Sequence, residues 1–166
     1  MAAASSFDIT TPIEFQEVDN ALNQARKEVG QRYDFKGATA DINLSTADKT
    51  LTLVADDEMK MNALWEIIQT RLTRRSVPVK NFKTKPSEPA AGGKLRRVIE
   101  IQSGIPIEAA REIVKFIKDA KWKRVQAAIQ ADQVRVTSPS KDELQTAIQA
   151  LRGHDFGIAL QFGNYR

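Results

Sequence analysis

Two short runs of this sequence combine cations, aromatic side chains and glycines. One is Arg32–Gly37 and the other is the closing run Arg152–Arg166. Cations pair with phosphates, aromatic rings stack on bases, and glycine lets a ligand approach the backbone closely. The two runs therefore predict a site for a ligand that carries phosphates and a base. Its candidate residues are Arg32, Lys36 and Arg152 for phosphates, Phe35, Phe156 and Tyr165 for stacking, and Asp155 for a base edge.

The same residues also fit a structural role. In the first run, Asp34 would pair with an arginine and Phe35 would be buried, so that the turn docks two domains against each other. In the closing run, Gly153 stops a helix, while Leu160 and Phe162 belong to the core of a last strand. The sequence leaves open whether the Arg32–Gly37 turn binds a ligand or docks the domains.

A second group of cations lies between residues 94 and 124. It forms a predicted basic patch of Arg97, Lys115, Lys121, Lys123 and Arg124, with Lys94, Arg96, Arg111 and Lys118 nearby. Trp122 lies within this patch, and an aromatic ring among cations is typical of a nucleic-acid surface. The same tryptophan would equally serve as a core residue between a helix and a sheet.

Signatures of catalysis are missing from the sequence. His154 is the only histidine, there is no cysteine, and no P-loop, G-x-G-x-x-G or G-x-S-x-G motif occurs. The adjacent Asp56 and Asp57 sit at a predicted helix start, where capping explains them. We therefore expect a binding protein that is not an enzyme, with no metal site and no cofactor.

The charge is distributed unevenly along the chain. Residues 1–70 hold six lysines and arginines against twelve aspartates and glutamates, whereas residues 71–166 hold nineteen against nine. A basic half of this kind attracts phosphates, and the acidic half restricts where they bind. The first residues lack the features of a signal peptide, and no apolar run approaches the roughly 20 residues of a membrane span. We expect a cytoplasmic protein with no membrane partner.

Hydrophobic periodicity predicts an alternation of strands and helices. In the first half, Phe7–Thr10 is a strand, Thr11 caps a helix that begins at Pro12 and has Glu14 at its third position, and 40–44 pairs with 50–54 in a hairpin. Asp56 or Asp57 caps a second helix, residues 77–82 form a strand, and residues 83–93 form a linker or an exposed loop. These elements give the order strand, helix, strand, strand, helix, strand.

The second half repeats this order. A strand at 97–102 precedes a helix that opens at Pro106, residues 125–130 and 133–137 form a hairpin, and Ser140 with Glu143 caps a helix before a strand at 160–165. Thr11–Glu14 matches Ile105–Glu108, and the apolar positions of the helices match at a constant offset. We infer an α+β fold built as a tandem duplication of two ferredoxin-like βαββαβ sandwiches.

Four segments resemble the YajQ family of bacterial nucleotide-binding proteins, and the likeness covers nearly the whole chain. They are Ser6–Ile9, Arg32–Gly37, the stretch from Val125–Ala127 to Gln133–Thr137, and Leu160–Phe162 with Asn164–Arg166. The resemblance implies two ferredoxin-like domains that exchange their N-terminal strands. The first domain is then 11–104, and the second is 105–166 plus 1–10. Without the exchange, the domains are 1–83 and 94–166.

The resemblance also implies nucleotide or RNA binding and, in some members, recognition of cyclic di-GMP. A guanine nucleotide, with cyclic di-GMP as the sharpest candidate for a signalling effector, is our first hypothesis, and a transcription factor is its expected protein partner. The alternatives are a non-specific RNA or tRNA binder and a protein-interaction adaptor. Because the predicted central strands lack the aromatics with which RNA-recognition motifs stack bases, we expect binding at loops, at a sheet edge or between domains.

Overall fold

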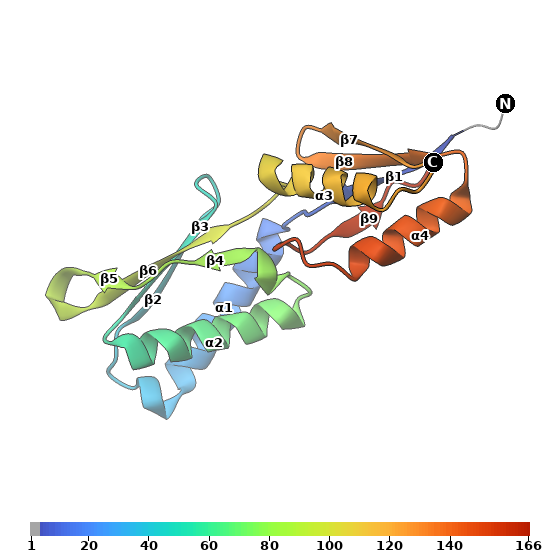
Figure 1. Cartoon of the computed structure of the whole chain (residues 1–166). Coiled ribbons are helices and arrows are strands. Elements are labelled where there is room, and N and C mark those ends of the chain that lie inside the picture. Colours follow the sequence, from blue (N-terminus) through green and yellow to red (C-terminus); the bar gives the residue numbers. More distant parts are fainter. Residues whose placement is uncertain (1–3) are drawn as a thin grey trace. The chain divides into compact units, whose positions relative to one another are not determined.

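A computed structural model describes residues 4–166 of the chain, which form an α+β structure with two antiparallel sheets and four α-helices (Figure 1). Two compact units divide these residues between them. One contains Ile13–Ile101, and the other contains the described residues through Pro12 together with Gln102–Arg166. The arrangement is compatible with two ferredoxin-like domains.

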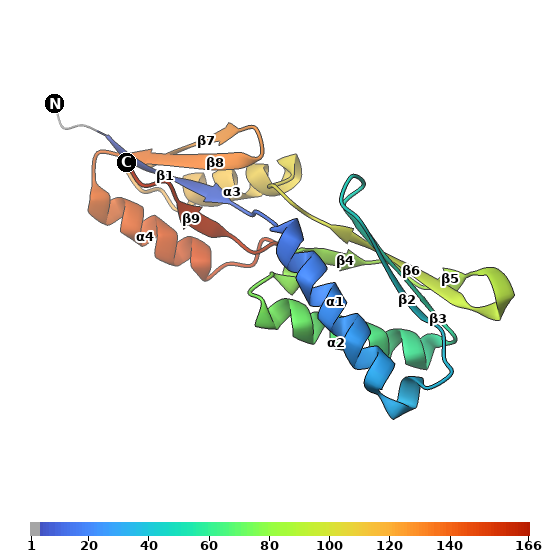
Figure 2. The ribbon, with the colours of Figure 1, turned by 180° about the vertical axis from the view of Figure 1, so that it is seen from behind.

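The unit Ile13–Ile101 packs two helices on one face of a sheet. Its helices α1 and α2 lie on the same side of the strands, as Figure 1 and the reverse view in Figure 2 show. The strand order is β2-β3-β6-β4, with the short β5 paired to β6. The elements are α1 (Phe15–Gln31), β2 (Ala40–Ser45), β3 (Thr50–Ala55), α2 (Glu58–Arg74), β4 (Phe82–Thr84), β5 (Glu88–Pro89) and β6 (Leu95–Ile101).

Alternation along the strands builds the core of this unit. Leu51 and Leu53 of β3 face the helices and are fully buried, while Thr50 and Thr52 point to the open face and are partly exposed. Ile99 of β6 pairs with Leu51 and is also fully buried. The helices contribute a matching apolar side that includes Val18, Leu22, Leu64, Ile68 and Leu72. The predicted hairpin and the cap of α2 are confirmed, because Asp57 Oδ1 accepts a hydrogen bond from the Lys60 amide at 2.8 Å.

Two predictions for this half of the chain are wrong. The predicted capping box at Thr11 does not form, because α1 begins at Phe15 and Glu14 stands at its N-cap. Thr11 is instead buried, and its carbonyl accepts a hydrogen bond from the Gly104 amide at 3.0 Å. The strand predicted at 77–82 is a 3-10 helix, Val79–Asn81, followed by β4.

Residues 83–93, which we predicted to form a linker or loop, contribute to the sheet. They contain the end of β4, the short strand β5 and a 3-10 helix, Ala91–Gly93. In β5, Glu88 pairs with Arg96 and Pro89 with Leu95 of β6. Glu88 Oε1 also accepts hydrogen bonds from Arg96 Nε and Nη2 at 3.0 and 2.9 Å. The composition of the segment suits a turn, but its pairing with β6 orders residues 88–89 as one arm of a hairpin.

The second unit has the strand order β7-β8-β1-β9, with the N-terminal strand β1 between β8 and β9. The two sheets therefore share one pattern, in which β6 holds the place in the first sheet that β1 holds in the second. The elements are β1 (Ser5–Thr10), α3 (Ile107–Asp119), β7 (Gln126–Gln130), β8 (Gln133–Ser138), α4 (Lys141–Arg152) and β9 (Gln161–Gly163).

Strands from both ends of the chain supply the core of this unit. Phe7 and Ile9 of β1 are fully buried beside Val134 and Val136 of β8. The helices α3 and α4 cover them with apolar residues that include Ile113, Ile117, Leu144, Ile148 and Leu151. The predicted cap of α4 forms, since Ser140 Oγ accepts a hydrogen bond from the Glu143 amide at 3.3 Å. Across residues 4–166, no helix combines the length and apolar composition needed to cross a membrane.

A buried carboxylate joins three strands on the other face of this sheet. Asp8 Oδ1 accepts a hydrogen bond from Arg135 Nε of β8 at 2.9 Å. Its Oδ2 accepts from Arg135 Nη2 at 3.3 Å and from Nδ2 of Asn164, which follows β9, at 2.6 Å. Only 5% of Asp8 is exposed. The pKa of Asp8 is lowered, first because Arg135 donates to the carboxylate and also through Asn164, against the opposing effect of burial.

The variant Asp8→Asn tests this arrangement. We expect it to lower the free energy of unfolding by about 2 kcal/mol at neutral pH, since hydrogen bonds to a charged group are lost. The folded pKa lies below the ordinary 3.8, so the ionised carboxylate stabilises the fold fully above that value. The stabilisation is lost as the pH falls through the lowered pKa. Urea titrations of both proteins at neutral and acidic pH measure the difference.

The control is Asp41→Asn, which changes an exposed aspartate in β2. It should leave stability within about 0.5 kcal/mol of the parent. A gap between the parent protein and Asp8→Asn that stays constant into acid would show that the effect comes from packing and not from charge.

Candidate functional site

The turn between α1 and β2 carries three of the predicted site residues. The helix α1 ends at Gln31, Arg32 is extended, and Tyr33–Phe35 form one turn of 3-10 helix. Phe35 anchors this turn, since it is only 4% exposed and belongs to the core of the unit. Gly37 then reverses the chain with a φ of +73°, a conformation that a side chain would strain. The turn is therefore held from inside by one aromatic ring.

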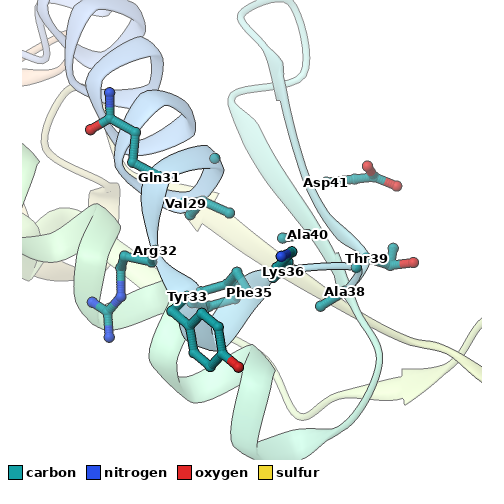
Figure 3. Close-up of a pocket in the computed structure, with 12 residues that line it drawn as sticks. Val29, Gln31, Arg32, Tyr33, Phe35, Lys36, Ala38, Thr39, Ala40 and Asp41 are labelled. Carbon is teal, nitrogen blue, oxygen red and sulfur yellow. The ribbon is translucent and has the colours of Figure 1, made fainter.

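A surface hollow of about 770 Å³ opens beside this turn. Figure 3 shows the side chains that line it, with Arg32 and Tyr33 projecting from the end of α1 and Asp41 at the far side on β2. The lining also includes Lys36 and Gly37, and a Cβ built at Gly37 would meet no atom within 4 Å. Backbone and cations are thus accessible together on one concave surface, of a size that is typical of small-molecule sites.

Tyr33 is the most exposed large aromatic residue of the described chain, at 88%. The sequence favoured Phe35 for stacking, but Phe35 faces the core and cannot offer its ring to a ligand. The two residues are two positions apart in a single 3-10 turn, so they point in different directions. The one signal in the sequence that could have distinguished the two rings is the tyrosine hydroxyl. Because this hydroxyl needs a polar partner, a tyrosine near a phenylalanine is more often the exposed ring of the two.

Arg32 is held by carboxylates. Its Nε and Nη2 donate to the two oxygens of Asp34 at 3.0 and 2.9 Å, and its Nη1 lies 3.5 Å from Glu28 Oε2. The pKa of Asp34 is lowered chiefly because Arg32 donates to it. Both side chains of the Arg32–Asp34 pair remain more than 40% exposed, so solvent screens the interaction and a ligand can reach it. The guanidinium is pre-oriented, but it is not an unpaired charge.

Two lysines, Lys60 and Lys94, help to hold the turn in place. Lys60 of α2 donates to the Asp34 carbonyl, and its ammonium lies 5.2 Å from the centre of the Phe35 ring. At the start of β2, the Thr39 amide donates to Asp56 Oδ2 at 2.9 Å, and Lys94 forms an ion pair with the same carboxylate. The pKa of Asp56 is lowered, first by the hydrogen bond from Lys94. Both ends of the turn are therefore fixed, one to α2 and the other to Asp56, the residue before the α2 cap.

The remaining predicted ligand residues belong to the other unit. Arg152 lies over the Phe162 ring at 5.3 Å, and Asp155 Oδ1 accepts from the Gly157 amide at 2.8 Å. Phe156 is 8% exposed and packs edge-on against Phe116 at 5.6 Å. The sequence places these residues close together, but the structure gives Asp155 a turn-forming role and Phe156 a core role.

Tyr165 is the accessible member of this group, at 59% exposure. It lines a hollow of about 320 Å³ together with Lys141 and Arg166, and its ring lies 6.3 Å from that of Phe7. His154 is exposed after the end of α4, and its ring lies 4.5 Å from that of Phe156. Within residues 4–166, no group of three histidine, aspartate or glutamate residues is arranged to hold a metal ion.

The predicted basic patch is divided between the two units. Arg97 lies on β6 with its side chain only 12% exposed, and its Nη2 contacts Glu58 and Asn62 of α2 at 3.3 and 3.0 Å. Exposed cations of the other unit follow the surface of α3 and the loop after it, namely Lys115, Lys121, Lys123 and Arg124. Trp122 is partly buried against the core of that unit. Arg97 thus contributes little accessible charge, whereas the cations of α3 and its loop face solvent.

Comparison with known proteins identifies relatives of the whole chain. The family model described as nucleotide-binding protein YajQ-like matches residues 5–166. A protein of Trichlorobacter lovleyi is 48% identical over 162 residues, which cover 97% of this chain and 98% of the relative. A protein of Nitratidesulfovibrio vulgaris is 49% identical over 161 residues, with coverage of 97% and 98%. A protein of Carboxydothermus hydrogenoformans is 43% identical over the full length of both chains. All three are named nucleotide-binding protein.

Unfolding measurements can test whether Phe35 supports the fold and Tyr33 does not. We expect Phe35→Ala to lower the free energy of unfolding by about 3 kcal/mol, because a buried ring is removed from the core. Tyr33→Ala should change it by less than about 0.5 kcal/mol, because the ring contributes almost no buried surface. Urea unfolding of both variants measures the difference. Equal losses would show that Tyr33 also supports the fold.

Proposed function

We propose a function from one established premise, which is that this chain belongs to the YajQ-like family of nucleotide-binding proteins. The proposed function is the non-catalytic binding of a nucleotide in the hollow beside the Arg32–Gly37 turn. The observation that carries it is the exposure of Tyr33 between two cations, Arg32 and Lys36, on the rim of that hollow. A ring and two cations in one concave surface match the parts of a nucleotide.

Tyr33 would provide the stacking platform. An aromatic side chain that is 88% exposed contributes little to folding, so its place in the sequence suits a contact made with a partner. Stacking of one base on such a ring is worth about 1–3 kcal/mol. Phe35, underneath, would keep the turn rigid and so reduce the entropy that the ligand's binding costs.

The phosphates would meet Lys36 first. No charged partner of its ammonium is seen in the described part of the chain, whereas Arg32 already pairs with Asp34 and Glu28. A phosphate bound at Lys36 would then also lie near the Arg32 guanidinium, which would keep its pairs with Asp34 and Glu28. The missing Cβ of Gly37 leaves the adjacent backbone open, as close approach of a phosphate requires.

Within this function, we propose a guanine nucleotide as the ligand and cyclic di-GMP as the sharpest candidate. A cyclic dinucleotide carries two phosphates for the two cations. Asp41 lies on the far side of the hollow, where an acceptor-only carboxylate would suit the N–H groups of a guanine edge. The chain would then act as an effector in signalling, changing its interactions when the nucleotide binds.

We also infer that the two units derive from one βαββαβ ancestor and have exchanged their first strands. The matching strand orders support this, because β1 and β6 hold equivalent places in sheets otherwise made of the opposite half of the chain. Only one unit carries the Arg32–Gly37 turn, so the nucleotide site would have arisen in one copy.

A second candidate function is RNA binding, and the cations of α3 and its loop favour it. Lys115, Lys121 and Lys123 are exposed, and no carboxylate partner of theirs is seen among residues 4–166. In contrast, Arg71 and Arg75 pair with Glu28 and Glu17 at 2.8 and 3.0 Å. RNA would therefore follow the surface of α3, and its affinity would fall steeply with added salt.

Substitutions in the turn test the nucleotide site. We expect the double variant Arg32→Ala with Lys36→Ala to bind cyclic di-GMP at least about tenfold more weakly than the parent protein. Tyr33→Ala should lower the affinity by about the same factor, because it removes one stacking contact. Tyr33→Phe should keep most of the affinity because it keeps the ring. Titration calorimetry at two salt concentrations, with GTP and ATP beside cyclic di-GMP, measures the affinities and the salt dependence.

The matched control is Lys27→Ala, an exposed cation of α1 outside the lining of the hollow. It should leave nucleotide affinity unchanged. If the turn variants bind as tightly as the parent protein with the same salt dependence, the assignment of the site is wrong. If only RNA binds, in a filter-binding titration that Lys121→Ala with Lys123→Ala weakens, the second function replaces the first.

A further inference from the structure

The strand β7 leaves one edge of its sheet open. It pairs with β8 alone, at the end of the order β7-β8-β1-β9 (Figure 1). Four of its five residues, Gln126, Ala128, Ile129 and Gln130, are exposed. The outer edge of such a strand presents unpaired N–H and C=O groups, which can bind another strand.

The other edges of the two sheets are protected, and β7 is not. On the edge strand β2, the Ile42 carbonyl accepts a hydrogen bond from Arg26 Nη2 at 2.7 Å. The edge strands β4 and β9 have three residues each, and the two-residue β5 ends in a proline. In β7, the sequence Gln-Ala-Ala-Ile-Gln contains no charge, proline or glycine. Charges, prolines and short strands are the usual means of blocking an edge.

We propose that β7 pairs antiparallel with β7 of a second copy of this chain, about a twofold axis at Ala128. In this register, Gln126 lies opposite Gln130 of the partner subunit, and Ala127 lies opposite Ile129 of the partner subunit. Ala128 faces its own equivalent, and its small side chain lets the strands approach at the axis. Each pair joins residues on the same face of the sheet, so the pleats of the two copies continue.

Charge complementarity selects this register and this partner. Arg124 and Asp132 stand four residues before and four residues after Ala128. Both residues lie in the turns that flank β7, and the twofold axis places the turn that carries Arg124 beside the partner's turn that carries Asp132 of the partner subunit, at both ends of the pair. Arg124 is accessible, with 64% of its side chain exposed and Glu143 of its own chain 3.7 Å away. An unrelated extended peptide could use the same backbone edge. A second copy of this chain, however, brings a negative charge to each Arg124 and a positive charge to each Asp132.

The hairpin tip that carries Asp132 is held in place. Its carbonyl accepts a hydrogen bond from the Ile105 amide at 2.9 Å. A Cβ at Gly104 would lie 2.6 Å from Asp132 Oδ2, so the glycine leaves the space that the carboxylate occupies. Pairing would also cover Ile129, which is 37% exposed on the face of the sheet that packs against the helices. The proposal thus accounts for the open edge, the exposed isoleucine and the flanking charges together.

Sedimentation equilibrium of the full chain tests the proposal. Over a roughly hundredfold range of protein concentration, we expect a reversible equilibrium between monomer and dimer. Ala128→Glu and Ala128→Lys each place like charges opposite each other at the axis and should weaken dimerisation at least about tenfold. An equimolar mixture of the two variants should recover it, because glutamate then faces lysine. Loss of folding in either variant could not produce such recovery.

A second pair of variants uses the flanking charges. Arg124→Glu and Asp132→Lys should each weaken dimerisation, and their mixture should again recover it. The control is Asn43→Glu, an exposed position of the edge strand β2, which should leave dimerisation unchanged. The proposal is overturned if the chain sediments as a monomer at every concentration, if all four variants dimerise like the parent protein, or if neither mixture recovers.

Discussion

The buried interaction of Asp8 with Arg135 and Asn164 fixes the N-terminal strand in a sheet made otherwise from the last third of the chain. The carboxylate oxygens of Asp8 accept hydrogen bonds from Arg135 of β8 and from Asn164, which follows β9. On the opposite face, Phe7 and Ile9 fill the core beneath α3 and α4. The unit that contains the C-terminus therefore cannot complete its core until residues from both ends of the chain have met. This requirement makes the contact order high and ties the integrity of one unit to the N-terminal strand.

Local pattern predicted the helices and the two central hairpins because each of these elements depends on nearby residues. Alternation of apolar residues marked β2, β3, β7 and β8, and capping by Asp57 and Ser140 marked the starts of α2 and α4. The errors occurred where a distant partner decides the outcome. Thr11 has the residue type of a helix cap, but its carbonyl is taken by Gly104, more than ninety residues away. Lys83 and Thr84 have the composition of a loop, but they pair with Glu100 and Ile99 of β6.

The candidate site was predictable as a segment but not in its detail. Cations, rings and glycines in Arg32–Gly37 indicated a binding turn, and the structure brings Arg32, Lys36 and the backbone of Gly37 to one hollow. Which ring is offered to a ligand depends on how a single 3-10 turn is rotated against the core, and residue type does not encode that rotation. The same holds for Phe156, whose neighbour Phe116 comes from another helix. Asp155, in contrast, accepts from the Gly157 amide within its own turn, a local pattern that aspartate before glycine favours.

The carboxylates around Arg32 constrain what the hollow can bind. Asp34 and Glu28 already satisfy the guanidinium, so an anion must compete with two negative charges for it. A carboxylate ligand would gain little from such an exchange. A phosphodiester with a stacking base can approach Lys36 and Tyr33 first, and these contacts do not require the Arg32 pairs to break. At the proposed site, affinity would therefore depend on the base as much as on the phosphate, which favours a nucleotide over inorganic phosphate and a base-rich ligand over a bare polyanion.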